Sequence, residues 1–190
     1  MWFGLLAPYT LLTVAAVHQL RRSGRFRELL RLRSGDISLG IVVGLVMVAA
    51  GMLALRQGFP LGSPQQEWLF TIYAQVGNPN LMPAVLMLPL LACCEELVWR
   101  GWVGESLAAQ VGQRAALPLT AFLYALAHAP TAFTLSSSIA GPNPLVLLAA
   151  LGAGLCWAFA ARAWGRLIPV IVSHAVFTYF LASPPPPWLP

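Results

Sequence analysis

The sequence predicts an all-α membrane protein, a polytopic bundle of about six transmembrane helices with both termini outside the cell. Of its 190 residues, 58% are hydrophobic and only 9% are charged, and the mean hydropathy is +0.74. A soluble domain carries roughly 25% charged residues, so the polar side chains are too few to cover a water-exposed surface. The apolar residues also fall into stretches of the length that crosses a bilayer. These observations exclude a soluble globular domain, a disordered chain and a nucleic-acid-binding module.

Six apolar stretches are the predicted helices: residues 2–20, 37–55, 81–104, 115–133, 144–162 and 167–182. Residues 56–80 and 134–143 are expected to be turn-rich or loop connections, because Gly, Pro and Ser recur in them. The segment Phe26–Arg33 mixes arginines with apolar residues. It is therefore either a short interfacial amphipathic helix or a basic loop. The proline-rich residues 184–190 are expected to form an extended tail.

The arginines set the predicted orientation. All eleven basic residues are arginine, and six of them lie between Arg21 and Arg33. If the spans alternate from an outside N-terminus, nine arginines face the cytoplasm, Arg56 lies outside and Arg100 lies within a span. This distribution agrees with the positive-inside rule. We therefore expect residues 1–190 to form a single integral membrane domain, a multi-pass protein of the plasma (inner) membrane that has no nucleic-acid partner.

Ionisable side chains inside the predicted spans are the candidate site. Glu95, Glu96 and Arg100 lie in the third span, His128 in the fourth and His174 in the sixth. A charged group at the bilayer centre costs about 2.5–3.5 kcal/mol on insertion scales. We therefore expect these groups to face one another, or a wet cavity between helices.

The two glutamates are expected to have different roles because they point in different directions. Glu96 and Arg100 are four residues apart and can pair along one helix face, whereas Glu95 lies about 100° around the helix. One carboxylate would be held ionised by arginine, and the other would face the cavity as a general acid or base. We assign the chemistry to Glu95 and the pairing to Glu96, although helical periodicity alone does not choose between them.

This constellation resembles the CPBP family of intramembrane proteases, which includes the CAAX prenyl endopeptidases related to Rce1 and bacterial Abi-type proteins. The resemblance covers about residues 85–180, the predicted catalytic core. It rests on Glu-Glu-x-x-x-Arg at 95–100, on aromatic-x-x-x-His at 124–128 and on Ser-His at 173–174. The run Gly-x-Gly-x-x-Trp at 152–157 gives further support.

The resemblance implies a glutamic-type endopeptidase that cleaves a membrane-embedded or lipid-anchored protein, or a C-terminal tail. Glu95 matches the glutamate that activates water, and His128 matches the histidine that assists it. His174 matches the histidine that stabilises the oxyanion, and Arg100 matches the arginine that orients the glutamates. An older interpretation of the family is metal-dependent, and zinc would then be held by Glu95, His128 and His174. The sequence has no HExxH motif, so we expect no cofactor.

Two positions depart from the family pattern. Tyr124 stands where the family has phenylalanine, a replacement that we expect to be tolerated. Thr178 stands where the family has asparagine, and Thr178, Ser173 and Tyr124 are the secondary candidates for the oxyanion site and cavity. Losing one oxyanion donor costs about 2.7–4 kcal/mol in the transition state. A second hypothesis is therefore a catalytically weak relative that acts as a membrane peptide-binding, immunity or accessory factor. A proton or ion pathway is a third hypothesis, although the sequence shows no internal repeat.

Overall fold

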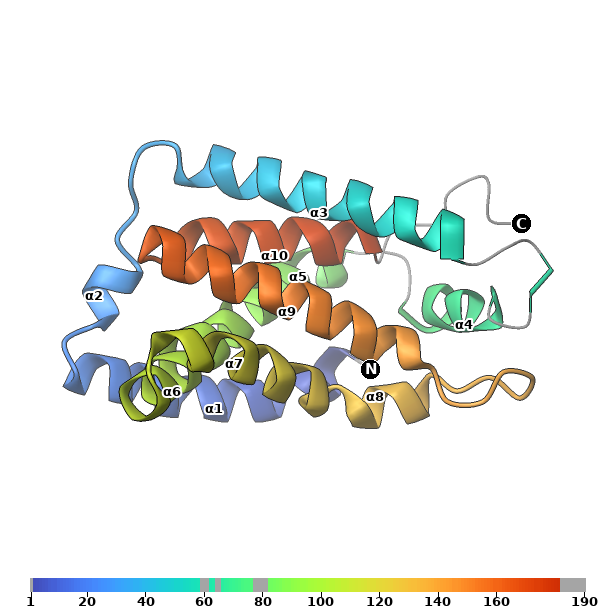
Figure 1. The fold of residues 1–190 in the computed structure, drawn as a ribbon, viewed down its shortest axis with the longest axis horizontal. Helices are drawn as coiled ribbons and strands as arrows, with labels where there is room; N and C mark the ends of the chain where they lie inside the picture. The colour runs from blue at the N-terminus through green and yellow to red at the C-terminus, as the bar shows by residue number, and fades with distance from the viewer. Residues whose placement is uncertain (1, 59–61, 64–65, 77–81, 182–190) are drawn as a thin grey trace.

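The computed structural model describes residues 2–58, 62–63, 66–76 and 82–181. In these ranges every secondary-structure element is a helix (Figure 1). An isolated bridge between Ser137 and Gly141 closes a turn in the predicted loop 134–143. The predicted all-α fold is thus confirmed. The predicted extended tail, residues 184–190, lies outside the described residues.

Each predicted apolar stretch coincides with a long helical segment. The long helices are α1 (Trp2–Arg22), α3 (Asp36–Gly58), α5 (Met82–Glu96), α7 (Gln113–Ala127), α9 (Pro144–Trp164) and α10 (Ile168–Leu181). The shorter ones are α2 (Phe26–Leu29), α4 (Gln66–Val76), η1 (Leu97–Val103), α6 (Gly104–Val111) and α8 (Ala129–Thr134). Of these, η1 is a π-helix that continues α5.

Three helical segments in the described part of the chain are long and apolar enough to cross a membrane. They are α3, α9 and the segment Gln113–Thr134 that joins α7 to α8. The apolar helix α10 is shorter, and α5 has 15 residues because it gives way to the π-helix after Glu96. Large apolar side chains on the outer faces of α3 and α9, such as Val46 and Phe159, are exposed. Length and composition thus support three of the six predicted spans directly.

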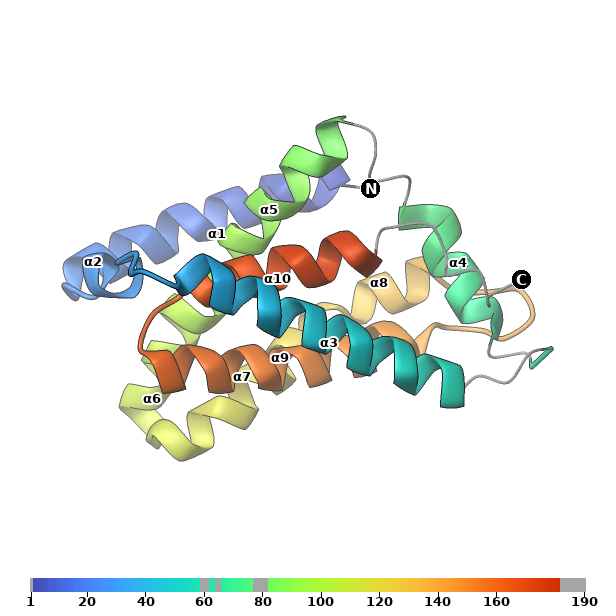
Figure 2. The ribbon, with the colours of Figure 1, turned by 90° about the horizontal axis from the view of Figure 1, so that it is seen from above.

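Helix α10 occupies the centre of the bundle and contacts α3, α5 and α9 (Figures 1 and 2). Helix α9 packs along α7, while α1 packs along α5 and η1. Because α5 carries the two glutamates and α10 carries His174, the α5–α10 contact decides whether the predicted site can assemble.

Two glycines on α3 allow its close contact with α10. A Cβ atom at Gly40 would lie 2.6 Å from the Pro169 carbonyl oxygen, and one at Gly44 would lie 2.8 Å from the Val176 Cβ. Small residues four apart let transmembrane helices approach backbone to backbone, where van der Waals contact replaces the hydrophobic effect. This packing fixes the position of α10, the helix that carries His174, against α3.

We expect Gly44→Ala to destabilise the protein by about 1–3 kcal/mol, because the added Cβ overpacks a contact that has no free volume. The measurement is unfolding in detergent or lipid discs. Gly51→Ala on the same helix is the matched control, since a Cβ there would meet its nearest neighbour, Phe177, at 4.0 Å. Equal losses from the two substitutions would contradict the role of Gly44.

The segment Phe26–Arg33 combines features of its two sequence interpretations. Only Phe26–Leu29 is helical, and the following residues are irregular. Leu29 is buried against Leu20 and Leu167, and the Leu167 backbone N–H donates to the Leu29 carbonyl at 2.8 Å. The apolar side of α2 is therefore docked on the protein, next to the turn between α9 and α10.

Ion pairs fasten the arginine-rich connections. Asp36, buried at the start of α3, accepts from Arg166 Nε at 2.8 Å and from the Arg33 backbone N–H at 2.9 Å. Arg25 donates from Nε to Glu105 at 3.0 Å and also bonds to Glu28. The hydrogen bond with Glu105 is the main cause that raises the pKa of Arg25, so this guanidinium stays charged at physiological pH.

Helix α4 was not predicted, because glycines and prolines on both sides made residues 56–80 resemble a turn-rich connection. The Gln66 side chain accepts from the Gly62 N–H at 2.9 Å, which stabilises the start of the helix. Trp68 Nε1 donates to the Ala140 carbonyl, and Asn143 Nδ2 donates to the Trp68 carbonyl. These long-range bonds join α4 to the 134–143 loop, and a short-range sequence pattern does not show them.

Candidate functional site

Four of the five ionisable groups predicted from the sequence meet inside the bundle, whereas His128, at the end of α7, is partly exposed. Glu95, Glu96, Arg100 and His174 are all buried, and Glu96 is 0% exposed. They come from α5, η1 and α10, which are brought together by the α5–α10 contact. Buried charges are stable only when they are paired and hydrogen-bonded, so the partners of each group determine what it can do.

Glu96 is the centre of the ionic network. Its Oε1 accepts from Arg100 Nη1 at 3.0 Å and from His174 Nδ1 at 2.8 Å. Arg100 Nη2 also donates to the Gly154 carbonyl of α9 at 3.2 Å. The Glu96 carboxylate therefore bonds to side chains of η1 and α10 and is engaged in charge pairing.

Glu95 points to different partners. Its Oε2 accepts from the Tyr124 hydroxyl at 2.8 Å and lies 3.8 Å from His174 Nε2. The latter distance is too long for a direct hydrogen bond. Glu95 thus has no arginine partner among the residues that the structure describes, and one of its oxygens lies beside the imidazole of His174.

The π-helix η1 positions Arg100. Within η1 the Gly104 N–H bonds to the Trp99 carbonyl, five residues back, and π-turns of this kind occur frequently at functional sites. Gly101 faces Leu20 of α1, where a Cβ would lie 3.0 Å from Cδ1. The apolar stretch 81–104 predicted an unbroken helix here. The Glu96–Arg100 pair forms nevertheless, because one wide turn still leaves the long arginine side chain within reach.

Tyr124 connects Glu95 with His128. Its hydroxyl bonds to Glu95, and its ring lies edge-to-face with the His128 ring at a centroid distance of 4.6 Å. His128 Nδ1 lies 2.8 Å from the Tyr124 carbonyl oxygen. Because a carbonyl can only accept, Nδ1 carries the proton and Nε2 of the neutral ring is left as a proton acceptor. Phenylalanine at position 124 could not make the hydrogen bond to Glu95.

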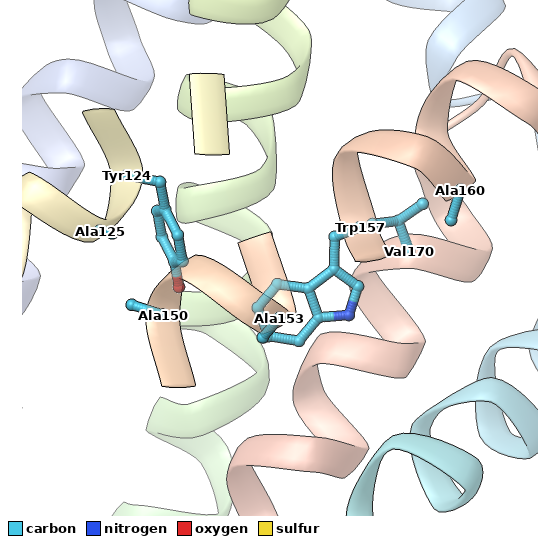
Figure 3. Packing of buried hydrophobic residues seen from close by; sticks show 7 residues of the cluster. All are labelled: Tyr124, Ala125, Ala150, Ala153, Trp157, Ala160 and Val170. Atoms are coloured by element: carbon cyan, nitrogen blue, oxygen red, sulfur yellow. The ribbon is translucent and has the colours of Figure 1, made fainter. Parts of the chain in front are cut away.

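Trp157 is a site residue that the sequence indicated only as the last position of the Gly-x-Gly-x-x-Trp run. Its indole ring stacks on the His174 imidazole with a centroid distance of 3.8 Å and an interplanar angle of 22°. Its Nε1 donates to Ser173 Oγ at 3.2 Å. Figure 3 shows Trp157 and Tyr124 in the same apolar cluster, and Arg100 lies over both rings at 5.4 and 4.5 Å. In the sequence, the run Gly-x-Gly-x-x-Trp at 152–157 was the feature that could have indicated a site role for Trp157.

We expect Trp157→Ala to destabilise the protein by about 3–5 kcal/mol, because it opens a large cavity beside His174. Trp157→Phe should cost less, since it keeps an aromatic ring and loses the bond to Ser173. The NMR resonances of the His174 ring protons report the stacking directly, because a stacked indole shifts them upfield. An unchanged His174 resonance in Trp157→Ala would show that the two rings are not stacked.

The secondary candidates occupy different environments. Ser173 is fully buried, and its Oγ accepts from Trp157 and donates weakly to the Met47 sulfur of α3 at 3.7 Å. Its hydroxyl is thus engaged in helix packing. Thr178 lies one turn after His174 on α10 and is partly exposed. Of these two side chains, Thr178 is the freer to reach a bound substrate.

A zinc-dependent site would need Glu95, His128 and His174 as ligands of one metal ion. Among the residues that the structure describes, no three His, Cys, Asp or Glu side chains are grouped as a metal ion requires. Glu96 and the Tyr124 carbonyl engage Nδ1 of His174 and of His128, so Nε2 of each ring is left for other partners. Metal-binding histidines have the same kind of bond at their second nitrogen, so a metal-free site stays a prediction.

Comparison with known families agrees with this geometry. The family model described as type II CAAX prenyl endopeptidase Rce1-like matches residues 77–180, more than half of the chain. A search of curated proteins and a search of solved structures gave no match. The matched region contains both glutamates, Arg100 and both histidines, which confirms the family resemblance drawn from these motifs. The protein is therefore a membrane protein that belongs to the Rce1-like family of CAAX prenyl endopeptidases.

Proposed function

We propose that the protein is an intramembrane endopeptidase of the glutamic type, in which Glu95 and His128 activate water and His174 stabilises the oxyanion. One observation carries this proposal. The two glutamates have different partners. Glu96 forms the ion pair with Arg100, whereas Glu95 is buried beside His174 and has no arginine partner among the described residues. A buried carboxylate in that position can accept a proton during the reaction.

The proposed reaction begins with water between Glu95 and His128. Glu95, assisted by Nε2 of His128, takes one proton from the water. At the same time the oxygen of the water attacks the scissile carbonyl carbon. The tetrahedral oxyanion then collapses, the C–N bond breaks and the proton passes to the leaving amine. Exclusion of bulk water from the buried site strengthens each of these electrostatic contacts.

His174 is suited to the oxyanion role by its orientation. The bond to Glu96 and the stack on Trp157 hold the imidazole plane. With Nδ1 donating to Glu96, the ring offers a second N–H at Nε2 when it carries both protons. The carboxylates of Glu95 and Glu96 compensate that charge. Thr178 would supply a weaker second donor in place of the family's asparagine.

The proposed topology has six spans with both termini outside, in the plasma (inner) membrane. The connection from α1 to α3, the corner between α6 and α7, and the turn between α9 and α10 lie together at one end of the bundle (Figure 1). Nine of the eleven arginines lie in these connections or in the adjoining ends of α1, α7 and α9. Their common location supports a cytoplasmic assignment for that end. Labelling of intact cells with a membrane-impermeant thiol reagent would test it. A cysteine introduced next to Arg56 should be labelled, and one introduced next to Arg114 should not.

The proposed substrate is a membrane-embedded or lipid-anchored protein, or the C-terminal tail of one. We expect cells that carry Glu95→Gln in place of the wild-type protein to accumulate such a protein in its uncleaved form. The measurement compares the protein termini of membrane fractions from the two strains. Terminal peptides that are identical in both strains would contradict a peptidase function and favour the alternative below.

The alternative function is that of a catalytically weak relative that binds membrane peptides or acts in immunity or as an accessory factor. The presence of Thr178 at the family's asparagine position is the observation that favours it. The substitution Thr178→Asn discriminates between the two functions. A peptidase should gain rate from the restored donor, whereas a binding protein should show no hydrolysis with either residue.

We also expect the activity to be insensitive to chelators, because the sequence has no HExxH motif that would bind zinc. Incubation of the purified protein with EDTA, followed by dialysis, should leave peptide hydrolysis unchanged. Loss of activity that zinc restores would overturn the metal-free mechanism.

A further inference from the structure

A cavity of about 240 Å³ lies at the arginine-rich end of the bundle, between α2, α6, α7 and α9. The residues that line it include three arginines, Arg25, Arg100 and Arg162, together with Glu105 and Gln113. The rest of the wall consists mainly of leucine and alanine side chains. A cationic rim on an apolar wall is suited to an amphiphilic anion.

The charges of the lining do not cancel. Glu105 is neutralised by Arg25, which reaches its two oxygens at 3.0 and 3.3 Å. Arg162 makes only a 3.5 Å contact with Gln113 and has no carboxylate partner among the described residues. Arg100 lines the cavity from within the bundle, with its side chain 1% exposed, and its Nε has no hydrogen-bond partner. Because Arg100 is paired with Glu96 at 3.0 Å, the positive charge that remains without a carboxylate partner at the cavity is that of Arg162.

The start of α7 adds to this field. The helix has 15 residues and begins at Gln113, and the N-cap residue, Gly112, has no side chain to accept from the first-turn N–H groups. No acidic residue occupies the first turn. Free N–H groups at a helix N-terminus attract anions, and phosphate in particular.

We propose that this cavity binds a phosphate-bearing anion, with the phosphate at Arg162, Gln113 and the start of α7 and its apolar part along the leucine and alanine wall. Guanidinium groups bind phosphate oxygens in bidentate geometry. In the proposed topology this end of the bundle lies in the cytoplasmic leaflet, where basic pockets between helices bind anionic lipid headgroups. A soluble phosphate has the same chemistry, so the test separates the two sources.

The bound anion is an effector and not a substrate. Arg100 belongs to both the cavity wall and the ionic network, whereas Glu95, His128 and His174 do not line the cavity as described. Gly154 and Tyr124 pack tightly beside Arg100, where a Cβ on Gly154 would lie 3.1 Å from the tyrosine ring. The cavity and the ionic network are thus joined through Arg100, and we expect an occupant to act on the site through the charge of that residue.

Lipid discs of phosphatidylcholine, with and without phosphatidylglycerol, test the proposal without any need for peptidase activity. Native mass spectrometry should show phosphatidylglycerol retained by the wild-type protein, together with a higher unfolding temperature. Arg162→Gln should weaken retention about tenfold, the effect of one lost charge-assisted contact. Arg56→Gln, at the other end of α3, removes the same charge and should leave retention unchanged.

A second variant and a second probe complete the test. Ala158→Leu fills the cavity without changing its charge and should also reduce retention. Inorganic phosphate added to phosphatidylcholine discs should stabilise the wild-type protein if the natural ligand is soluble, and should have little effect if it is a lipid. Equal retention by wild type and Arg162→Gln, or equal loss in Arg56→Gln, would overturn the site. Neither result bears on peptide hydrolysis by Glu95.

Discussion

Glu95→Gln is expected to lower the rate of peptide hydrolysis by about 10²–10⁴-fold, the usual contribution of a positioned general base. The substituted amide keeps an oxygen that can accept from the Tyr124 hydroxyl, so the packing around position 95 should survive. What it loses is the ability to take a proton from water. The prediction is therefore a loss of kcat in a protein with a nearly unchanged unfolding temperature.

The measurement is cleavage of a membrane peptide by purified protein in lipid discs, with the unfolding temperature recorded for each variant. Glu67→Gln on α4, which lies far from the site along the chain, is the matched control and should keep full rate. Tyr124→Phe should have a smaller effect of about tenfold, because it removes one hydrogen bond to a carboxylate. Full activity in Glu95→Gln would remove this residue from the mechanism.

The same comparison separates Glu95 from Glu96. Glu96→Gln removes the charge that holds both Arg100 and His174, so its effect should appear in stability as well as rate. The proposed roles would be supported if Glu95→Gln lowers only the rate and Glu96→Gln lowers both the rate and the unfolding temperature. The opposite pattern would make Glu96 the base.

Much of this site was predictable, because membrane insertion makes buried charge rare. The positions of the helices followed from apolar runs, and the Glu96–Arg100 pair followed from a four-residue spacing. Neither inference needed long-range information. The hydrogen bond between Glu96 and His174 joins residues 78 positions apart, and the stack of Trp157 on His174 joins α9 to α10. These contacts depend on how helices pack, which local periodicity does not encode.

Two errors of the sequence analysis have physical causes. Helix α4 was treated as a connection because glycine and proline flank it, yet its stability comes from bonds to a loop about 70 residues later. The π-helix η1 was expected to be α-helical because its composition is ordinary. Its wide turn coincides with the packing of Gly101 against α1, which only the folded structure shows.

Arg100→Leu is expected to destabilise the protein by about 3–5 kcal/mol, because it leaves the fully buried carboxylate of Glu96 without its cation. The guanidinium also bonds to the Gly154 carbonyl and lies over the rings of Tyr124 and Trp157, so its removal loosens α9. Unfolding in detergent measures the loss. Arg56→Leu, an exposed arginine at the end of α3, should cost little.

The double substitution Arg100→Leu with Glu96→Leu separates stability from function. Apolar residues that replace both members of a buried ion pair often restore stability or improve it, so the double variant should unfold at a higher temperature than Arg100→Leu. It should nevertheless remain inactive, because His174 would lose the acceptor of its Nδ1–H and with it the fixed orientation of Nε2 toward Glu95. Recovery of both stability and hydrolysis would mean that the pair serves folding alone. Recovery of stability without hydrolysis would mean that the ion pair is kept for the orientation of the histidine.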